Sequence, residues 1–137
     1  IGDTVTRLDR WETALNEAEP GDPRDTTSPA AMLASLQRVT LGEALSVGGQ
    51  AHLTGWLRAN KTGDKRLRAG LPGGWQAGDK TGAGERGTNN DAGLLWPPGE
   101  SAPILVAAYS TGGTAPSTER DAALAEVAAA IVAAKGP

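Results

Sequence analysis

The part of the chain that follows Trp75 constrains the fold most strongly. Three short runs are separated there by Gly and Pro, and they read WQAGDKTGA (75–83), TNNDAGLLWPPGE (88–100) and PILVAAYSTGG (103–113). Runs of this length between turn residues are typical of antiparallel strands joined by hairpins. The sequence therefore predicts three antiparallel strands, with PPGE forming the turn between the last two.

Helical patterns precede these strands. Ser28 and Pro29 match the start of a helix that ends near Gly42. Its apolar stripe consists of Met32, Leu33, Leu36 and Val39. A second helical run covers 46–60, with Leu53, Trp56 and Leu57 on one face. The following KRLRAG (65–70) is at most a short third helix.

A further helix is expected at the C-terminus, over 117–135. Ser117 or Thr118 is expected to cap it. Its buried stripe is expected to consist of Leu124, Val127, Ile131 and Val132. Helices, then strands, then a helix indicate an α+β protein with a helix packed on an antiparallel sheet.

The first 25 residues have no helical or strand period. They contain seven acidic and three basic residues and end in EPGDPRD, so we expect a long loop. The chain thus divides into a loop segment (1–27), a helical segment (28–72) and a segment of strands with the C-terminal helix (73–137).

Charge and composition exclude several classes of function. A net charge of −3 argues against a nucleic-acid partner, because phosphate binding needs a basic surface. The basic cluster RANKTGDKRLR (58–68) is interpreted as a solvated surface. Cysteine is absent and His52 is the only histidine, so no zinc site is expected. No apolar run reaches the roughly 18 residues of a membrane span.

The stretch GDKTGAGERG (78–87) has the small residues of a site whose backbone a ligand approaches closely. A phosphate loop needs Gly directly before Lys and a helix after it, but Asp79 precedes Lys80 and strand-like sequence follows. GAGERG (82–87) matches GxGxxG, yet it lacks the following helix and the later acidic residue of a dinucleotide site. The remaining interpretation is a strand that binds a carboxylate.

Lys-Thr-Gly occurs twice, and context separates the two copies. The copy at Lys61 follows the second helical run, and Gly63 is interpreted as a plain helix C-cap. The copy at Lys80 lies in an expected strand, where Gly82 and Gly84 would let a ligand lie along the backbone.

RWETALN (10–16), a proline-bearing loop, PAAM (29–32) and DKTGAGERG (79–87) follow one another in this order. This arrangement resembles the class A serine β-lactamases over almost the whole chain. The resemblance implies the serine β-lactamase and penicillin-binding-protein fold, with an antiparallel sheet flanked by helices and part of a helical domain. It implies neither a metal nor an organic cofactor, and a periplasmic or secreted location.

The resemblance also assigns roles in the loop segment. Glu12 resembles the general base that, with Asn16, holds the water that hydrolyses the acyl-enzyme. Arg10 and Asp25 resemble the ion pair that closes the family's omega loop. Thr13 stands where many relatives have proline after a cis peptide, and the sequence leaves both isomers open.

The strand residues resemble the substrate-binding part of the family site. Lys80 and Thr81 would attract and hydrogen-bond the carboxylate of the antibiotic, and the amide of Ala83 would form half of the oxyanion hole. Glu85 at the rim either touches the substrate side chain or is a plain exposed acid. Relatives have an arginine after the GERG turn, where this chain reads TNND (88–91). Arg66 either supplies that guanidinium or belongs to the basic surface.

The family's Ser-x-x-Lys and Ser-Asp-Asn motifs do not occur in these 137 residues. We expect both in an N-terminal half that precedes Ile1 and acts as this chain's partner, with a β-lactam antibiotic as substrate. The chain alone is expected to be inactive, with an uncovered edge along PILVAAYST. A penicillin-binding or carboxypeptidase domain and a non-catalytic complementation fragment are the alternatives.

Overall fold

The computed structural model describes residues 1–136. It contains helices α1 (Pro29–Thr40), α2 (Val47–Ala59) and α3 (Ser117–Lys135), strands β1 (Gln76–Ala83), β2 (Asn89–Trp96) and β3 (Ile104–Ser110), and the short 3-10 helices η1 (Ala14–Asn16) and η2 (Leu67–Gly70). None of the described helices is long and apolar enough to cross a membrane.

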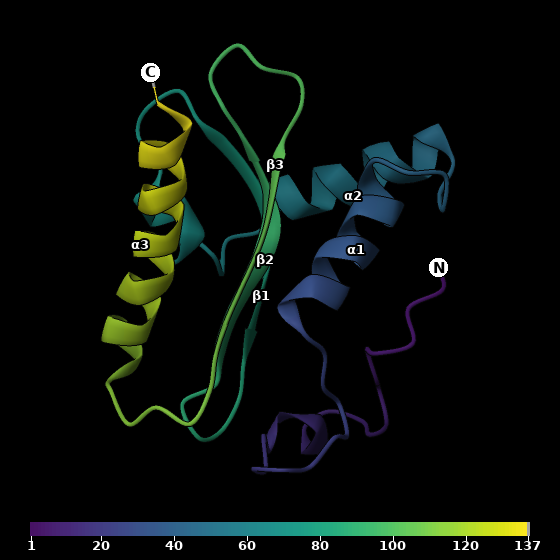
Figure 1. Ribbon diagram of the computed structural model, residues 1–137, viewed down its shortest axis with the longest axis vertical. Helices are drawn as coiled ribbons and strands as arrows, with labels where there is room; N and C mark the ends of the chain where they lie inside the picture. The colour runs from purple at the N-terminus through teal and green to yellow at the C-terminus, as the bar shows by residue number, and fades with distance from the viewer. Residues whose placement is uncertain (137) are drawn as a thin grey trace.

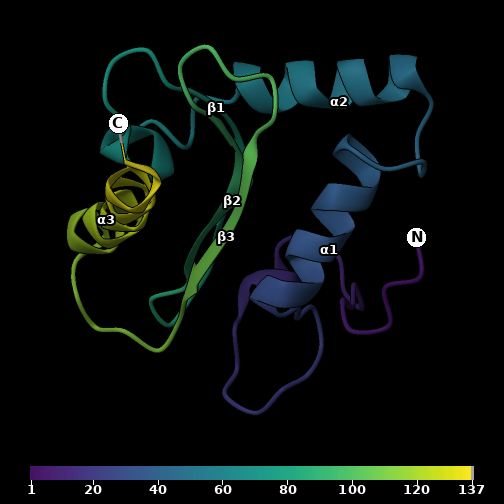
Figure 2. The same cartoon turned by 45° about the horizontal axis from the view of Figure 1, so that its top comes forward.

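The three strands form one antiparallel sheet in the order β1-β2-β3, as the sequence predicts. Thr81 lies opposite Asp91, and Ala92 lies opposite Ala107. Helix α3 covers one face of the sheet, and α1 and α2 lie on the other (Figures 1 and 2). The fold is therefore α+β with helices on both faces.

Each face of the sheet has its own apolar core. Beneath α3, the buried residues are Leu67, Ala77, Leu95, Val106 and Ala128. Beneath α1 and α2, they are Leu57, Leu94 and Trp96. Because alternate residues of a strand point to opposite faces, Leu94 and Leu95 serve different cores.

Helix α1 begins as predicted. Ser28 is its N-cap, and the Ser28 hydroxyl accepts a hydrogen bond from the Ala31 N–H at 3.1 Å. Pro29 takes the first helical position, where its missing N–H costs nothing.

The predictions for α2 and α3 need correction. Trp56 does not share the buried face of Leu57, because Trp56 is 71% exposed and Leu57 is buried. Helix α3 has Pro116 at its N-cap and no side-chain cap, so neither Ser117 nor Thr118 has the predicted role. Its buried residues are Leu124 and Ala128, whereas Val127 is exposed. The stripe turns toward small residues because η2 lies against the helix backbone: a Cβ on Gly70 would lie 1.9 Å from the Ala125 oxygen.

Candidate active site

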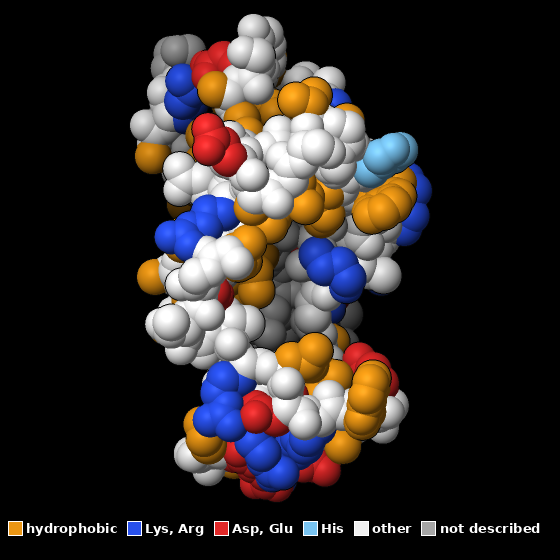
Figure 3. Space-filling view, turned by 90° about the vertical axis from the view of Figure 1, so that its right-hand side faces the viewer, with side chains coloured by type: hydrophobic (Ala, Val, Ile, Leu, Met, Phe, Trp, Pro, Cys, Tyr) orange, Lys and Arg blue, Asp and Glu red, His pale blue; other side chains and the backbone are white. Residues whose placement is uncertain are grey.

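A cleft of about 700 Å³ opens between the N-terminal loop, helix α1 and the sheet. Among its lining residues are Asn16, Met32, Lys80, Thr81, Ala83 and Tyr109. The side view of the surface shows charged side chains gathered at the lower end of the molecule, with apolar side chains around the hollow above them (Figure 3). The cleft thus joins a polar wall to an apolar one.

We call residues 3–27 the charged loop, and Glu12 and Asn16 lie in it. The Asn16 side-chain amide donates to Glu12 Oε2 at 2.6 Å. Helix η1 fixes Asn16, whose backbone N–H donates to the Thr13 oxygen at 3.0 Å. The peptide between Glu12 and Thr13 is cis, which answers the question that the sequence left open. The loop therefore holds a carboxylate and an amide together beside the cleft.

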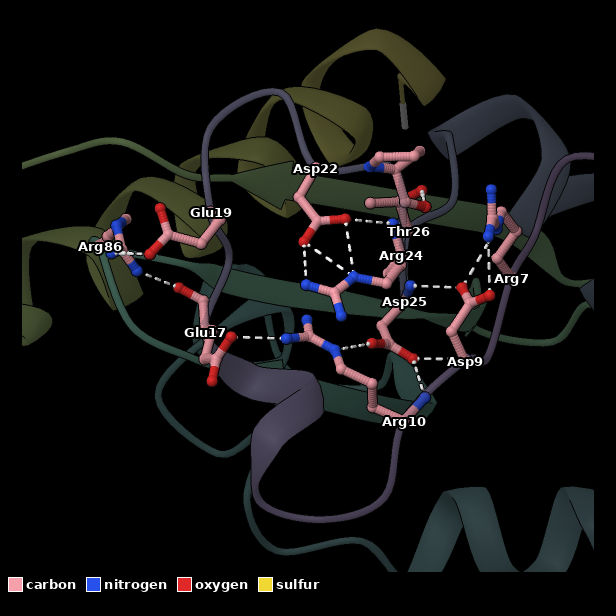
Figure 4. A network of polar contacts seen from close by, with 11 residues as sticks. Arg7, Asp9, Arg10, Glu17, Glu19, Asp22, Arg24, Asp25, Thr26 and Arg86 are labelled. Atoms are coloured by element: carbon pink, nitrogen blue, oxygen red, sulfur yellow. Dashed lines mark hydrogen bonds and ion pairs between the residues drawn. The ribbon is translucent and has the colours of Figure 1, made fainter.

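Arg10 and Asp25 connect two parts of the charged loop that are 15 positions apart in the sequence. Arg10 Nε lies 2.6 Å from Asp25 Oδ2, and Asp25 Oδ1 accepts from the backbone N–H groups of Asp9 and Arg10 at 2.6 and 3.0 Å. Burial opposes the charge of Asp25, but the hydrogen bonds from Arg10 and the backbone outweigh it and lower the pKa of that carboxyl. Arg10 also bonds Glu17 at 2.5 Å, and Figure 4 shows the network.

Lys80 and Thr81 lie on β1 at the cleft. Lys80 is exposed, and its ammonium donates to the Thr81 carbonyl at 2.7 Å. The Thr81 hydroxyl lies 2.5 Å from the Thr62 hydroxyl. Thr62 belongs to the other Lys-Thr-Gly, so the fold brings the two copies together.

The C-cap interpretation of Gly63 is wrong. Helix α2 ends at Ala59 with Asn60 as its C-cap. Gly63 instead makes room for a buried side chain, because a Cβ there would lie 1.8 Å from Asp79 Oδ2. The copy at Lys61–Gly63 therefore packs behind the copy at Lys80–Gly82.

The end of β1 meets the charged loop. Glu85 N–H donates to the Asn16 carbonyl at 2.8 Å. A Cβ on Gly84 would lie 2.7 Å from the same oxygen, so only glycine fits there without displacing the loop. The Glu85 side chain is 67% exposed at the rim. Ala83, the last residue of β1, borders the cleft beside them.

Arg66 is not part of a solvated basic surface, since its side chain is only 12% exposed. Its Nε lies 2.9 Å from Asp121 Oδ1, and its Nη1 donates to the carbonyls of Gly82 and Asn90 at 2.9 and 2.8 Å. Asn89 donates to the same Asp121 oxygen at 3.0 Å. The guanidinium is therefore fixed against the cleft-lining Gly82.

Two carboxyl groups buried beneath β1 and β2 escaped the sequence predictions. Asp79 is fully buried, bonds the Arg68 guanidinium and accepts from Asn60 Nδ2 at 2.8 Å. Asp91 is also fully buried, and its Oδ2 accepts from the Leu67 N–H at 3.2 Å. Burial and the nearby Asp79 charge raise the pKa of Asp91 to about 7. Strand alternation was the available signal, because Asp79 and Asp91 share the face of Ala77 and Leu95.

Other functional candidates were also missed. Arg68 lies in the cluster that was interpreted as solvated, and its contact with the buried Asp79 contradicts that interpretation.

Arg86 is a further residue that the sequence predictions did not include, and it contacts the charged loop. No group of three His, Asp or Glu side chains within residues 1–136 could hold a metal ion.

Comparisons with known proteins identify the family of this chain. Residues 1–134 match the model of the family described as "Beta-lactamase enzyme family". A β-lactamase of Streptomyces albus G is 54% identical over 123 residues, which cover 90% of this chain and 37% of the relative. The β-lactamase FAR-1 of Nocardia farcinica is 49% identical, with 98% and 42% covered.

Solved structures that resemble this chain belong to the same family as its sequence relatives. The chain matches the class A β-lactamase of the last common ancestor of Gram-negative bacteria with a TM-score of 0.94 and 61% identity, covering 97% of this chain and 50% of that one. A class A β-lactamase from Rhodopseudomonas palustris gives a TM-score of 0.93 and 55% identity, with 97% and 51% covered. The chain thus spans less than half the length of these curated relatives and about half of the solved chains.

Proposed function

This chain belongs to the class A β-lactamase family, and from that premise we propose that it supplies the deacylating base and the carboxylate-binding strand of a serine β-lactamase. The observation that carries the proposal is the 2.6 Å hydrogen bond from Asn16 to Glu12, made by a residue that lines the same cleft as Lys80 and Thr81. The reaction is hydrolysis of the β-lactam amide of an antibiotic.

In this proposal the reactive intermediate is an ester between the opened lactam and a serine. Glu12 takes a proton from a water molecule while the water oxygen attacks the ester carbonyl carbon. The Ala83 N–H stabilises the oxyanion that forms. The carbon–oxygen bond to the serine then breaks, the proton held by Glu12 passes to the serine oxygen, and the acid product leaves.

The same cleft would hold the substrate before this step. The Lys80 ammonium and the Thr81 hydroxyl bind the carboxylate of the antibiotic, and Gly82 leaves room for it along β1. Gly84, just beyond β1, lies against the Asn16 carbonyl and so holds the charged loop beside the substrate. Arg66 adds a second positive charge behind Gly82, where Asp121 fixes its guanidinium. Glu85 lies at the rim, where it meets the substrate's side chain.

The nucleophile has to come from a partner segment, because these 137 residues contain no Ser-x-x-Lys. We propose that this partner is the other half of the same enzyme, carrying Ser-x-x-Lys and Ser-Asp-Asn. The unpaired outer edges of β1 and β3 within the described sheet support this proposal, as does the length of the relatives. A periplasmic or secreted location goes with the same proposal.

The test combines this chain with a polypeptide that carries the two missing motifs. We expect the pair to hydrolyse a β-lactam, and we expect Glu12→Gln to lower turnover by about 10² to 10⁴ while an acyl-enzyme accumulates in intact mass spectra. Glu100→Gln is the matched control, because Glu100 pairs with Lys135 at 2.9 Å, outside the cleft lining. Unchanged turnover in Glu12→Gln would refute the assignment of the base.

A further inference from the structure

The turn between β1 and β2 carries Arg86 in an unusual backbone conformation. Its φ is +50°, in the region that non-glycine residues rarely adopt, and Gly87 follows at +70°. The loop after β3 holds the back of this turn. Gly112 N–H donates to the Arg86 carbonyl at 2.7 Å, and the hydroxyls of Thr88 and Thr111 lie 2.9 Å apart. The turn is therefore fixed to the sheet.

From this turn the Arg86 side chain extends to the charged loop (Figure 4). Its Nη1 donates to the Glu17 carbonyl at 2.5 Å, and its Nη2 forms an ion pair with Glu19 Oε1. The Arg86 and Glu19 side chains are 36% and 47% exposed, and such a pair alone contributes little. The planar guanidinium, however, binds a carbonyl and a carboxylate of the same loop at once, which fixes the geometry of both.

These contacts lie next to the proposed base. Glu17 directly follows Asn16, whose side chain holds Glu12 and whose carbonyl accepts from Glu85. The pairs 85–16, 86–17 and 86–19 form one seam between the turn and the loop. Arg10 holds the opposite side of Glu17 through its carboxylate.

We propose that Arg86 is a positioning residue for deacylation, which fixes the charged loop against the β1–β2 turn so that Glu12 and Asn16 keep their places. This inference rests on the proposed function. Acylation depends on a serine outside this chain and on the β1 residues that bind the substrate, whereas deacylation also depends on Glu12 in the loop. Loss of Arg86 therefore slows the second step and leaves the first.

The experiment separates the two rate constants in the combined enzyme by rapid-quench mass spectrometry. Arg86→Ala is expected to slow deacylation about fivefold, as loss of one such pair allows, with acylation unchanged. Arg86→Lys is expected to lie between Arg86→Ala and the unaltered enzyme, because one ammonium cannot hold both partners in a planar geometry.

A double-mutant cycle identifies the contact. Glu19→Gln removes the ion pair without altering the turn, and Arg86→Ala together with Glu19→Gln should slow deacylation by less than the product of the two single effects. Lys135→Ala is the matched control, since the exposed Lys135 pairs with Glu100 at 2.9 Å outside the cleft lining. It is expected to leave both rate constants unchanged.

Three results would overturn the inference: unchanged deacylation in Arg86→Ala, an equal fall in both steps, or multiplicative effects in the cycle. Where Arg86→Ala fails to fold, Glu19→Gln and Arg86→Lys decide by the same criteria. Glu12→Gln distinguishes the two proposals. If the acyl-enzyme accumulates in Glu12→Gln while Arg86→Ala deacylates normally, the role of Arg86 is rejected and the proposed function stands.

Discussion

Every residue among the first 27 is at least partly exposed, although the Asp25 side chain is only 3% exposed. In contrast, every residue of β2 except Asn90 is buried. The charged loop is ordered by hydrogen bonds and ion pairs that centre on Arg10, Asp25 and Arg86. The sheet is ordered by two apolar cores, one on each face. The difference teaches that the apolar residues that stabilise the fold and the proposed base Glu12 lie in separate parts of the molecule.

Truncation of the core should have the largest effect on stability. Leu95→Ala removes a fully buried side chain beneath α3, and large-to-small changes of this kind cost about 2–5 kcal/mol in unfolding free energy. Urea unfolding measures it. Leu8→Ala is the control in the loop, where the side chain is 81% exposed and no comparable loss is expected. Equal losses of unfolding free energy in Leu95→Ala and Leu8→Ala would show that the sheet and the charged loop do not differ in this way.

The pH dependence of stability should differ between the two regions. The folded pKa of Asp91 is about 7, above its usual value of 3.8, so its contribution is full below pH 3.8 and is lost as the pH rises toward 7. Asp91→Asn should remove this loss, which is at most a few kcal/mol, and flatten the urea midpoint between pH 4 and 7.

The loop carboxylates have the opposite sign. Hydrogen bonds from Arg24 lower the pKa of Asp22 to about 2, so its contribution is present above pH 3.8 and is lost as the pH falls toward 2. Acid should therefore loosen the loop while Asp91 still favours the folded sheet. If the urea midpoint of Asp91→Asn still fell between pH 4 and 7, the pH dependence in that range could not be assigned to Asp91.

The smallest effect on stability is expected from Arg10→Ala. The urea midpoint should barely move, because the apolar cores remain. Proteolysis of the charged loop should accelerate, and turnover of the combined enzyme should fall by roughly a hundredfold through misplacement of Glu12. Arg7→Ala provides the control, as its pair with Asp9 at 2.7 Å lies outside the cleft lining. A large shift of the midpoint would show that the loop and the sheet share their stability.

The sequence predicted the elements better than it predicted the contacts between them. Strands, hairpins and the start of α1 depend on local residues such as Ser28 and Pro29, and the structure has them as expected. The Thr62–Thr81 contact depends on how α2 lies against β1, and Arg66 meets Asp121 from 55 positions away. No local pattern carries such information. The buried Asp79 and Asp91 were missed for a different reason, because strand alternation places them on the face of Ala77 and Leu95 and that signal was not used.

The strand order of the sheet also affects the order in which the chain folds. Its strands are neighbours along the chain and pair in sequence order, so short loops are enough to close it. Local pairings form faster than distant ones because less chain entropy is lost first. The β1-β2-β3 meander is thus expected to assemble early, as a template on which the contacts between Arg66 and Asp121 and between Arg86 and the charged loop are made later.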